Sequence, residues 1–253
     1  TQYRSYIMDT CSVFLIEHQY TLTIISTMRT RRLILLILRP LLWLFFWLWV
    51  LFILVLLSLR WYPPPSTSFM LQDNKVPLLY IWQDWSEIPA SLPLAVVAAE
   101  DQRFPMHYGF DFQQIQNAFS EFQSGRRLRG ASTITQQVCK NLFLWSGGGL
   151  FRKGIEAVCT LHLELLWPKR RILEIYLNIA EFAPGVYGVQ AASQYYFQTD
   201  MGELKKQEAA QLVTLLPNPR EYSENLDSDY LRGRKEWVLQ QMQQLGGAYL
   251  EGL

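Results

Sequence analysis

The stretch AVVAAEDQRFPMHYGFD, Ala95 to Asp111, runs from five small apolar residues into two adjacent acids, Glu100 and Asp101. A chain that could bury this whole turn has instead placed carboxylates at its end. The residues alone allow two interpretations, a solvated helix end or a carboxylate that does chemistry, and they do not decide between them. More polar and aromatic residues follow the acids: Arg103, Phe104, His107 and Gly109.

The composition is that of one domain of ordinary size with appendages. The chain has 253 residues, of which 50% are hydrophobic, and this is enough for a sizeable core. Because 23 Lys+Arg face 22 Asp+Glu, the net charge of +1 argues against general nucleic-acid binding. Cys11, Cys139 and Cys159 are too few for a disulfide scaffold, and none has metal-ligand spacing with a histidine, which argues against zinc. An oxidising compartment would permit a Cys139–Cys159 bond, which the sequence leaves open.

A membrane span is predicted at PLLWLFFWLWVLFILVLLSL, Pro40 to Leu59, a run without a charged residue. Its length suits one helix across roughly 30 Å of hydrocarbon. A buried core helix is the weaker interpretation, because soluble cores rarely need apolar residues on every face. Arginines are more numerous before the run than after it, so the N-terminus is expected in the cytoplasm. Those before it are Arg29, Arg31, Arg32 and Arg39, and Arg60 follows it.

The segments around the span define the expected organisation. Met28 stands directly before RTRRLILLILRP, and we expect it to be the native start, with residues 1–27 not native. Residues 1–39 then form the cytoplasmic segment and 40–59 the span. WYPPPSTS lies within an expected stiff, proline-rich linker at 60–68, and the folded domain is expected at 69–253.

The folded part has helical periodicity, and the predicted class is mostly α. In DFQQIQNAFSEFQSG, Asp111 is a candidate N-cap, apolar residues recur at helical spacing from Phe112 to Phe122, and Gly125 can end the helix. No alternating run is long enough to predict a sheet. Other predicted helices cover 150–167, 170–178, 204–216 and 229–245, and a turn is predicted at PGVYG, 184–188.

Two further segments carry more polar detail than a helical core needs. In GASTITQQVCKNLFL, 130–144, Ser132 or Thr133 can cap a helix, and a polar face then follows. In FRKGIEAVCTLHLELLW, 151–167, Arg152 and Lys153 lie one turn before Glu156, so two cations and an acid can converge. An exposed polar face and a surface ion pair worth under about 1 kcal/mol are the structural alternatives. The basic residues Arg126, Arg127 and Arg129 could meet anionic headgroups.

Together, five motifs resemble the glycosyltransferase domain of the monofunctional biosynthetic peptidoglycan transglycosylases, which is related to the polymerising domain of class A penicillin-binding proteins. The motifs, in family order from about Val76 to Leu245, are EDQRFPMHYGFD, GASTITQQVCKNLFLW, RKGIEA, RRILEIYLNIAEF and AAQLVTLLPNP. The resemblance implies a lysozyme-like helical domain with a smaller membrane-facing jaw lobe. It also implies a single-pass protein of the cytoplasmic membrane whose catalytic domain is periplasmic.

The resemblance implies polymerisation of lipid II by inverting transfer, with release of polyprenyl pyrophosphate. The implied partners are lipid II, the growing glycan strand, membrane lipids and the cell-wall proteins that supply transpeptidation, with no nucleic acid. No cofactor is required, although a divalent cation such as Mg²⁺ at Glu156 is an option.

Site residues follow from the same resemblance. Glu100 matches the catalytic base and Glu156 the second essential acid. Lys140, Arg152 and Lys153 match cations that meet the pyrophosphate. The other residues expected to contact substrate are Asp101, Phe104, His107, Ser132, Thr133, Gln136, Gln137 and Asn141.

The chain also departs from the family pattern. WSGGG places Gly148 where related chains carry an arginine, and Lys169 is a candidate to replace its charge. Ala183 and Pro184 stand where a glycine and an acidic or polar residue are usual. Two other functions remain open: a catalytically weak scaffold that binds lipid II, and a lysozyme-like glycoside hydrolase.

Overall fold

The computed structural model describes residues 36–73, 78–124 and 132–253, and every structural statement below concerns these ranges. Several predictions lie outside them: the start at Met28, most of the N-terminal arginines, the helix stop at Gly125 and the basic cluster of residues 126, 127 and 129. The described chain divides into two compact units between Val55 and Leu56.

The N-terminal helix spans Leu36–Leu59, a length of 24 residues with a mean hydropathy of 2.7. By length and composition it can cross a membrane, as predicted, and it includes the whole expected run from Pro40 to Leu59. Only 6% of its most apolar window is buried within the protein. An apolar helix of this length is suited to hydrocarbon, where a helix satisfies its own backbone hydrogen bonds.

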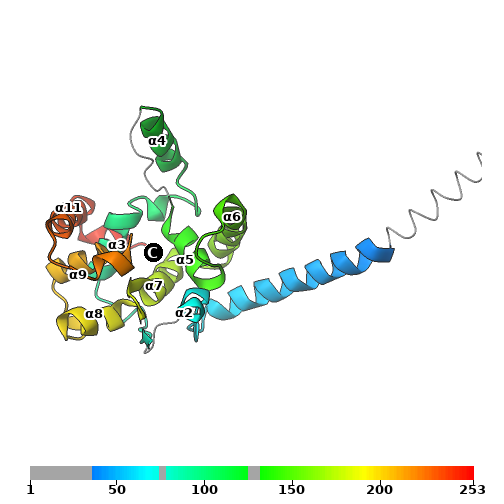
Figure 1. Cartoon of the computed structure of the whole chain (residues 1–253), viewed down its shortest axis with the longest axis horizontal. Coiled ribbons are helices and arrows are strands. Elements are labelled where there is room, and N and C mark those ends of the chain that lie inside the picture. Colours follow the sequence, from blue (N-terminus) through cyan, green and yellow to red (C-terminus); the bar gives the residue numbers. More distant parts are fainter. Residues whose placement is uncertain (1–35, 74–77, 125–131) are drawn as a thin grey trace, which may run out of the picture. The chain divides into compact units, whose positions relative to one another are not determined.

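The unit from Leu56 to Leu253 is mostly α, as predicted (Figure 1). Its α-helices are α2 (Ser68–Gln72), α3 (Ser91–Glu100), α4 (Phe112–Gln123), α5 (Ile134–Phe143), α6 (Gly149–Leu166), α7 (Lys169–Ile179), α8 (Val189–Phe197), α9 (Lys206–Val213), α10 (Pro219–Tyr222) and α11 (Asp229–Leu245). Three short 3-10 helices are η1 (Phe104–Met106), η2 (Met201–Glu203) and η3 (Gly247–Leu250). Three strands complete the unit: β1 (Leu79–Tyr80), β2 (Glu181–Ala183) and β3 (Val186–Tyr187).

Helices α3 and α7 form the centre of the core. Every residue of α7 from Arg171 to Ile179 is buried, and α7 packs against α3 and α5. In α3 the run from Leu92 to Ala98 is buried without interruption, since α9 and α11 cover it on further sides. A helix that is apolar all round belongs inside a protein. The apolar run that precedes Glu100 therefore delivers this acid to the middle of the unit.

The prediction that no sheet forms is wrong. A three-stranded sheet has the order β1-β3-β2, with β1 parallel and β2 antiparallel to β3. Strands of two or three residues are too short to produce a recognisable alternation. The predicted turn is present between β2 and β3, and Gly188 closes it at φ +85°, where a Cβ atom would lie 2.5 Å from the Asn178 carbonyl oxygen.

The segment at 60–68, predicted to be a stiff proline-rich linker, makes contacts within the compact unit. Pro64 is buried, and its carbonyl accepts a hydrogen bond from Tyr80 Oη at 2.8 Å. Arg171 Nη2 donates to the carbonyl of Tyr62 at 2.7 Å, and Thr67 caps α2 by accepting from Met70 N. The compact unit, Leu56 to Leu253, therefore includes this segment.

Candidate active site

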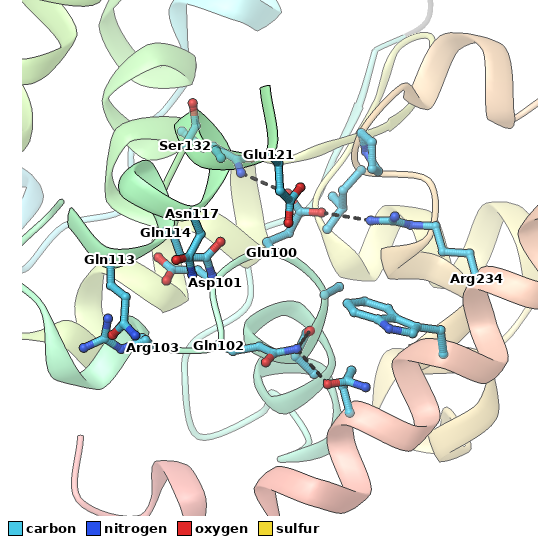
Figure 2. Close-up of a pocket in the computed structure, with 18 of the residues that line it drawn as sticks. Glu100, Asp101, Gln102, Arg103, Gln113, Gln114, Asn117, Glu121, Ser132 and Arg234 are labelled. Atoms are coloured by element: carbon cyan, nitrogen blue, oxygen red, sulfur yellow. Dashed lines mark hydrogen bonds and ion pairs between the residues drawn. The ribbon is translucent and has the colours of Figure 1, made fainter. Parts of the chain in front are cut away.

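A cavity of about 690 Å³ opens around Glu100, the last residue of α3 (Figure 2). Helices α4, α5 and α11 provide most of the remaining walls, and Leu216 and Pro217 add to them. The lining side chains are mostly polar. They include Glu100, Asp101, Gln102, Arg103, Gln113, Gln114, Asn117, Glu121, Ser132, Gln137, Lys140, Arg234, Trp237 and Gln241.

The two carboxylate oxygens of Glu100 face different helices. Gln137 Nε2 on α5 donates to Oε2 at 3.0 Å, and Tyr176 Oη donates at 3.0 Å to the Oε1 atom of the same glutamine. Arg234 Nη2 on α11 lies 3.6 Å from Glu100 Oε1, a contact drawn in Figure 2. Burial raises the pKa of Glu100, and it outweighs the opposing effects of Gln137, Arg234 and Lys140. A carboxylate with a raised pKa is a stronger base, which suits proton abstraction.

Among the residues that follow Glu100, Asp101, Phe104 and His107 are buried and hold the chain next to the cavity in place. Asp101 lines the cavity, but its Oδ2 accepts from Ile134 N at 3.1 Å and its Oδ1 lies 2.9 Å from His107 Nε2. His107 is buried, and Phe104 is fully buried with Lys169 Nζ 4.4 Å from its ring centre. Phe104 and His107, both expected to contact substrate, do not line the cavity. These side chains fix Asp101 and the chain that leaves α3.

Helix α5 begins with a capping box, so some residues of its predicted polar face cap the helix and the others line the cavity. Thr133, rather than Ser132, is the N-cap, and its backbone N–H donates a hydrogen bond to Gln136 Oε1 at 3.1 Å. Thr133 and Gln136 are both buried, so they hold the helix start and do not line the cavity. Gln137 and Lys140, together with exposed Ser132, do line it. Asn141 is half-buried and lies outside the lining.

Lys140 is a half-buried amine. Burial lowers its pKa, and nearby Arg152 and Lys153 act in the same direction, whereas Glu156 and Glu100 oppose them. Its Nζ lies 5.4 Å from the ring centre of Phe69. An anion arriving in the cavity would favour the charged form of this amine, since the two would attract in a poorly hydrated setting.

The cluster of Arg152, Lys153 and Glu156 on α6 is not a surface ion pair. The Glu156 side chain is 2% exposed, Arg152 Nη1 donates to its Oε2 at 2.6 Å, and Lys153 Nζ donates to its Oε1. Lys153 Nζ also donates to Ser132 Oγ at 2.9 Å, which connects α6 to the cavity wall. A buried carboxylate shared by two cations fixes both of them, because removing it would leave uncompensated charge.

These contacts also bear on a metal ion. Both oxygens of Glu156 already accept from cations, so a divalent ion there would displace them against their charge. A second buried group, Asp101, His107 and Asp111, has ligand atoms within 4.8 Å of one another. Yet Arg103 Nη1 donates to Asp111 Oδ1 at 3.0 Å, and Mg²⁺ prefers an all-oxygen shell with water. Neither group fits Mg²⁺.

The glycine loop before α6 is contacted by Arg152 and not by Lys169. Gly147, Gly148 and Gly149 all have positive φ, and Arg152 Nε donates back to the Gly147 carbonyl. Lys169, the candidate replacement, instead forms an ion pair with Glu164 at 2.9 Å. Arg152 therefore occupies the loop, and the expectation that Lys169 reaches the site is wrong.

The structure resolves the open question about Cys139 and Cys159. The two residues form a disulfide between α5 and α6, with their Cα atoms 6.0 Å apart. The bond lies beside Lys140 in sequence on one helix and one turn after Glu156 on the other. It thus connects the two helices that supply the cationic side of the cavity.

Sequence reasoning missed the α11 wall and the polar face of α4. Arg234, Trp237 and Gln241 stand at spacings of three and four residues, the one signal that could have placed them on a common face. On α4, the apolar residues from Phe112 to Phe122 are exposed, so they are not core residues. The cavity-facing residues of α4 are Gln113, Gln114, Asn117, Ala118 and Glu121.

Comparison with known proteins identifies close relatives of the chain. Residues 77–243 match the sequence model of the family described as Transglycosylase. A biosynthetic peptidoglycan transglycosylase of Marinomonas sp. (strain MWYL1) is 54% identical over 202 residues, which cover 80% of this chain and 89% of the relative. Proteins of the same name from Shewanella frigidimarina and Ectopseudomonas mendocina are 53% and 48% identical, covering 76% and 83% of this chain and 84% and 90% of the relatives.

Proposed function

This chain belongs to the transglycosylase family, and from that premise we propose that it polymerises lipid II into glycan strands. It is an enzyme of peptidoglycan synthesis, as its relatives' shared name states. The observation that carries the proposal is the placement of Glu100. A half-buried carboxylate with a raised pKa lies in one cavity with Lys140, and the Arg152–Lys153–Glu156 cluster reaches that cavity through Ser132.

The geometry supports a single displacement. The Glu100 carboxylate accepts the proton of the acceptor sugar's 4-hydroxyl while that oxygen attacks the anomeric carbon of the donor. The bond from this carbon to the pyrophosphate breaks, and its electron pair leaves on the phosphate oxygen. Lys140, Arg152 and Lys153 meet the developing negative charge, and Glu156 holds the last two in place. One displacement inverts the anomeric configuration, giving a β-linked strand from an α-linked donor.

The membrane setting is part of the proposal. The N-terminal helix is proposed to anchor the chain in the cytoplasmic membrane, and the arginines on its N-terminal side support a catalytic unit outside the cytoplasm. The exposed apolar face of α4 suits contact with membrane lipids, which surround a lipid-linked substrate. Cross-linking of the finished strands is assigned to partner proteins that supply transpeptidation.

The test is polymerisation of labelled lipid II by the detergent-solubilised full chain, with products separated by length. Wild type should make long strands and Glu100→Gln none, because the amide cannot accept the proton. Exposed Glu236 on α11 provides the matched control, and Glu236→Gln should behave as wild type. Thermal unfolding of each variant would show that folding is unaffected.

Two results would contradict the proposal. Binding of lipid II by wild type without any strand synthesis would favour the scaffold. Release of fragments from finished peptidoglycan, with loss of that release in Glu100→Gln, would favour the hydrolase. The cluster of cations beside Glu100 argues against the hydrolase, since a sugar leaving group carries no pyrophosphate charge.

A further inference from the structure

The α11 wall of the cavity is unused in the reaction described above. Arg234, Trp237 and Gln241 share one face of α11 and line the cavity. In the view of Figure 2, Arg234 and Ser132 lie on opposite sides of Glu100. The contacts agree, because Glu100 Oε1 faces Arg234 and Oε2 faces Gln137 on α5. The base therefore stands between two walls of different chemistry.

We infer that Trp237, Gln241 and Gln102 form a carbohydrate-binding surface for the N-acetylated sugar whose hydroxyl Glu100 deprotonates. The inference rests on the proposed function, and it assigns the acceptor sugar to the α11 side of the cavity. It adds residues that determine how the acceptor binds.

The chemistry of this wall suits a sugar ring. Trp237 is half-buried at the cavity surface, so part of its indole is accessible. An aromatic side chain offers an apolar face, which matches the C–H face of a pyranose, and a polar edge. Sugar hydroxyl and N-acetyl groups need donors and acceptors, and carboxamides supply both. The wall combines the two kinds of group within one helix face and the adjoining loop.

Gln102 and Gln241 are positioned before a ligand arrives. Gln102 Nε2 donates to Gln241 Oε1 at 3.0 Å and to the Ala98 carbonyl at 3.1 Å. The Gln102 carbonyl accepts from Tyr249 Oη at 2.7 Å, which fixes the loop after α3. Within the described ranges, Gln102 Oε1 and Gln241 Nε2 have no side-chain or backbone partner. One acceptor and one donor thus remain for a ligand, on side chains that are already held.

Charge assigns the two walls to different ligand groups. The α5 wall carries Lys140, and Ser132 connects it to Lys153, so an anionic pyrophosphate is stabilised there. Among the cavity-lining residues of α11, Arg234 is the charged one, and it faces Glu100. Its charge is partly balanced by this carboxylate. The uncharged part of the wall, Trp237 and Gln241, is therefore suited to the neutral acceptor sugar.

The experiment uses the detergent-solubilised full chain and two probes, lipid II and N-acetylchitotetraose, which carries N-acetylated sugars without lipid or phosphate. Trp237→Leu should raise KM for lipid II about tenfold, as expected for truncating a tryptophan anchor. Its kcat should change less, because Glu100 and the cations are untouched. Trp237→Phe should recover much of the loss, and Gln241→Leu should also raise KM.

Matched controls lie on the same helix, outside the cavity lining. Tyr230→Leu removes an exposed aromatic ring and Gln244→Leu an exposed amide, and both should keep the wild-type KM. Saturation-transfer NMR should detect N-acetylchitotetraose on wild type, on Glu100→Gln and on Lys140→Met, and not on Trp237→Leu. Retention by the lysine variant would separate this surface from the phosphate side.

Three results would overturn the inference. A wild-type KM in both Trp237→Leu and Gln241→Leu would overturn the inference, and so would oligosaccharide binding that survives loss of Trp237. No oligosaccharide binding to wild type would overturn it as well. Failure of wild type to polymerise lipid II would instead contradict the proposed function, while the oligosaccharide experiment would still test the surface.

Discussion

Replacing Gly148 by alanine measures the loss of stability when a Cβ atom is added to the glycine loop beside Arg152. Gly147 and Gly148 have φ values of +87° and +89°, so alanine pays the same conformational cost at either position. A Cβ atom at Gly147 meets nothing within 4 Å. At Gly148 it would lie 2.7 Å from Trp145 Nε1 and 2.9 Å from Arg152 Cβ. Gly147→Ala is therefore a matched control for Gly148→Ala.

The magnitudes follow from these two terms. Left-handed backbone costs a non-glycine residue about 1–2 kcal/mol, and this applies to both variants. Overpacking adds about 1–3 kcal/mol, and this applies to Gly148→Ala alone. In a unit of this size, 1 kcal/mol shifts Tm by about 2–4 °C. The Tm of Gly148→Ala should thus lie about 2–12 °C below that of Gly147→Ala.

The assay is thermal unfolding of the detergent-solubilised full chain, followed by near-ultraviolet circular dichroism, with strand synthesis measured in parallel. Displacing Arg152 Cβ moves a guanidinium that donates to Glu156, so Gly148→Ala should also lose more activity than its control. Gly148→Arg carries the same Cβ atom and should not restore activity, although it returns the charge usual in the family.

The reasoning fails if Gly147→Ala and Gly148→Ala unfold at the same temperature. It fails equally if Gly148→Arg gains both stability and rate over wild type. Either result would mean that the loop readily adopts another conformation in which residue 148 points away from Trp145.

Two other perturbations test the electrostatics and the covalent link of the site. Arg234→Gln removes a cation that lowers the pKa of Glu100, so this pKa should rise further. The acid limb of the plot of kcat/KM against pH should therefore move to higher pH. An unmoved limb would mean that Arg234 does not act on the base. Cys139→Ala with Cys159→Ala removes a bond between residues 20 positions apart, which should cost about 3 kcal/mol and lower Tm. Reductant should lower Tm in wild type and leave the double variant unchanged, and equal Tm values for oxidised wild type and the double variant would contradict this stabilisation.

Features encoded within one helix could be predicted from sequence. The α11 bounds match the predicted 229–245, because its periodicity ends at Gly246, which has φ +82°. Asp111 caps α4, and Arg152 and Lys153 converge on Glu156 as their spacing indicates. In each case the partners lie within about one helical turn, where backbone geometry alone fixes their distance.

Features that depend on tertiary packing could not be predicted in this way. The motif after α3 places Asp101 at the cavity and Phe104 in the core, although both belong to one short polar stretch. Arg234 reaches Glu100 only because α3 packs against α11, far along the chain. The Cys139–Cys159 bond similarly requires α5 to lie beside α6.

The exposure of helix α4 bears on its local stability. It contains no buried residue, and its apolar side chains face outward while its polar ones line the cavity. A helix with so little burial has a small free energy of local opening, so it should exchange amide protons before α3 or α7 does. The wall formed by α4 should then be the least costly part of the cavity to displace, and a bound molecule could move it without disturbing the core.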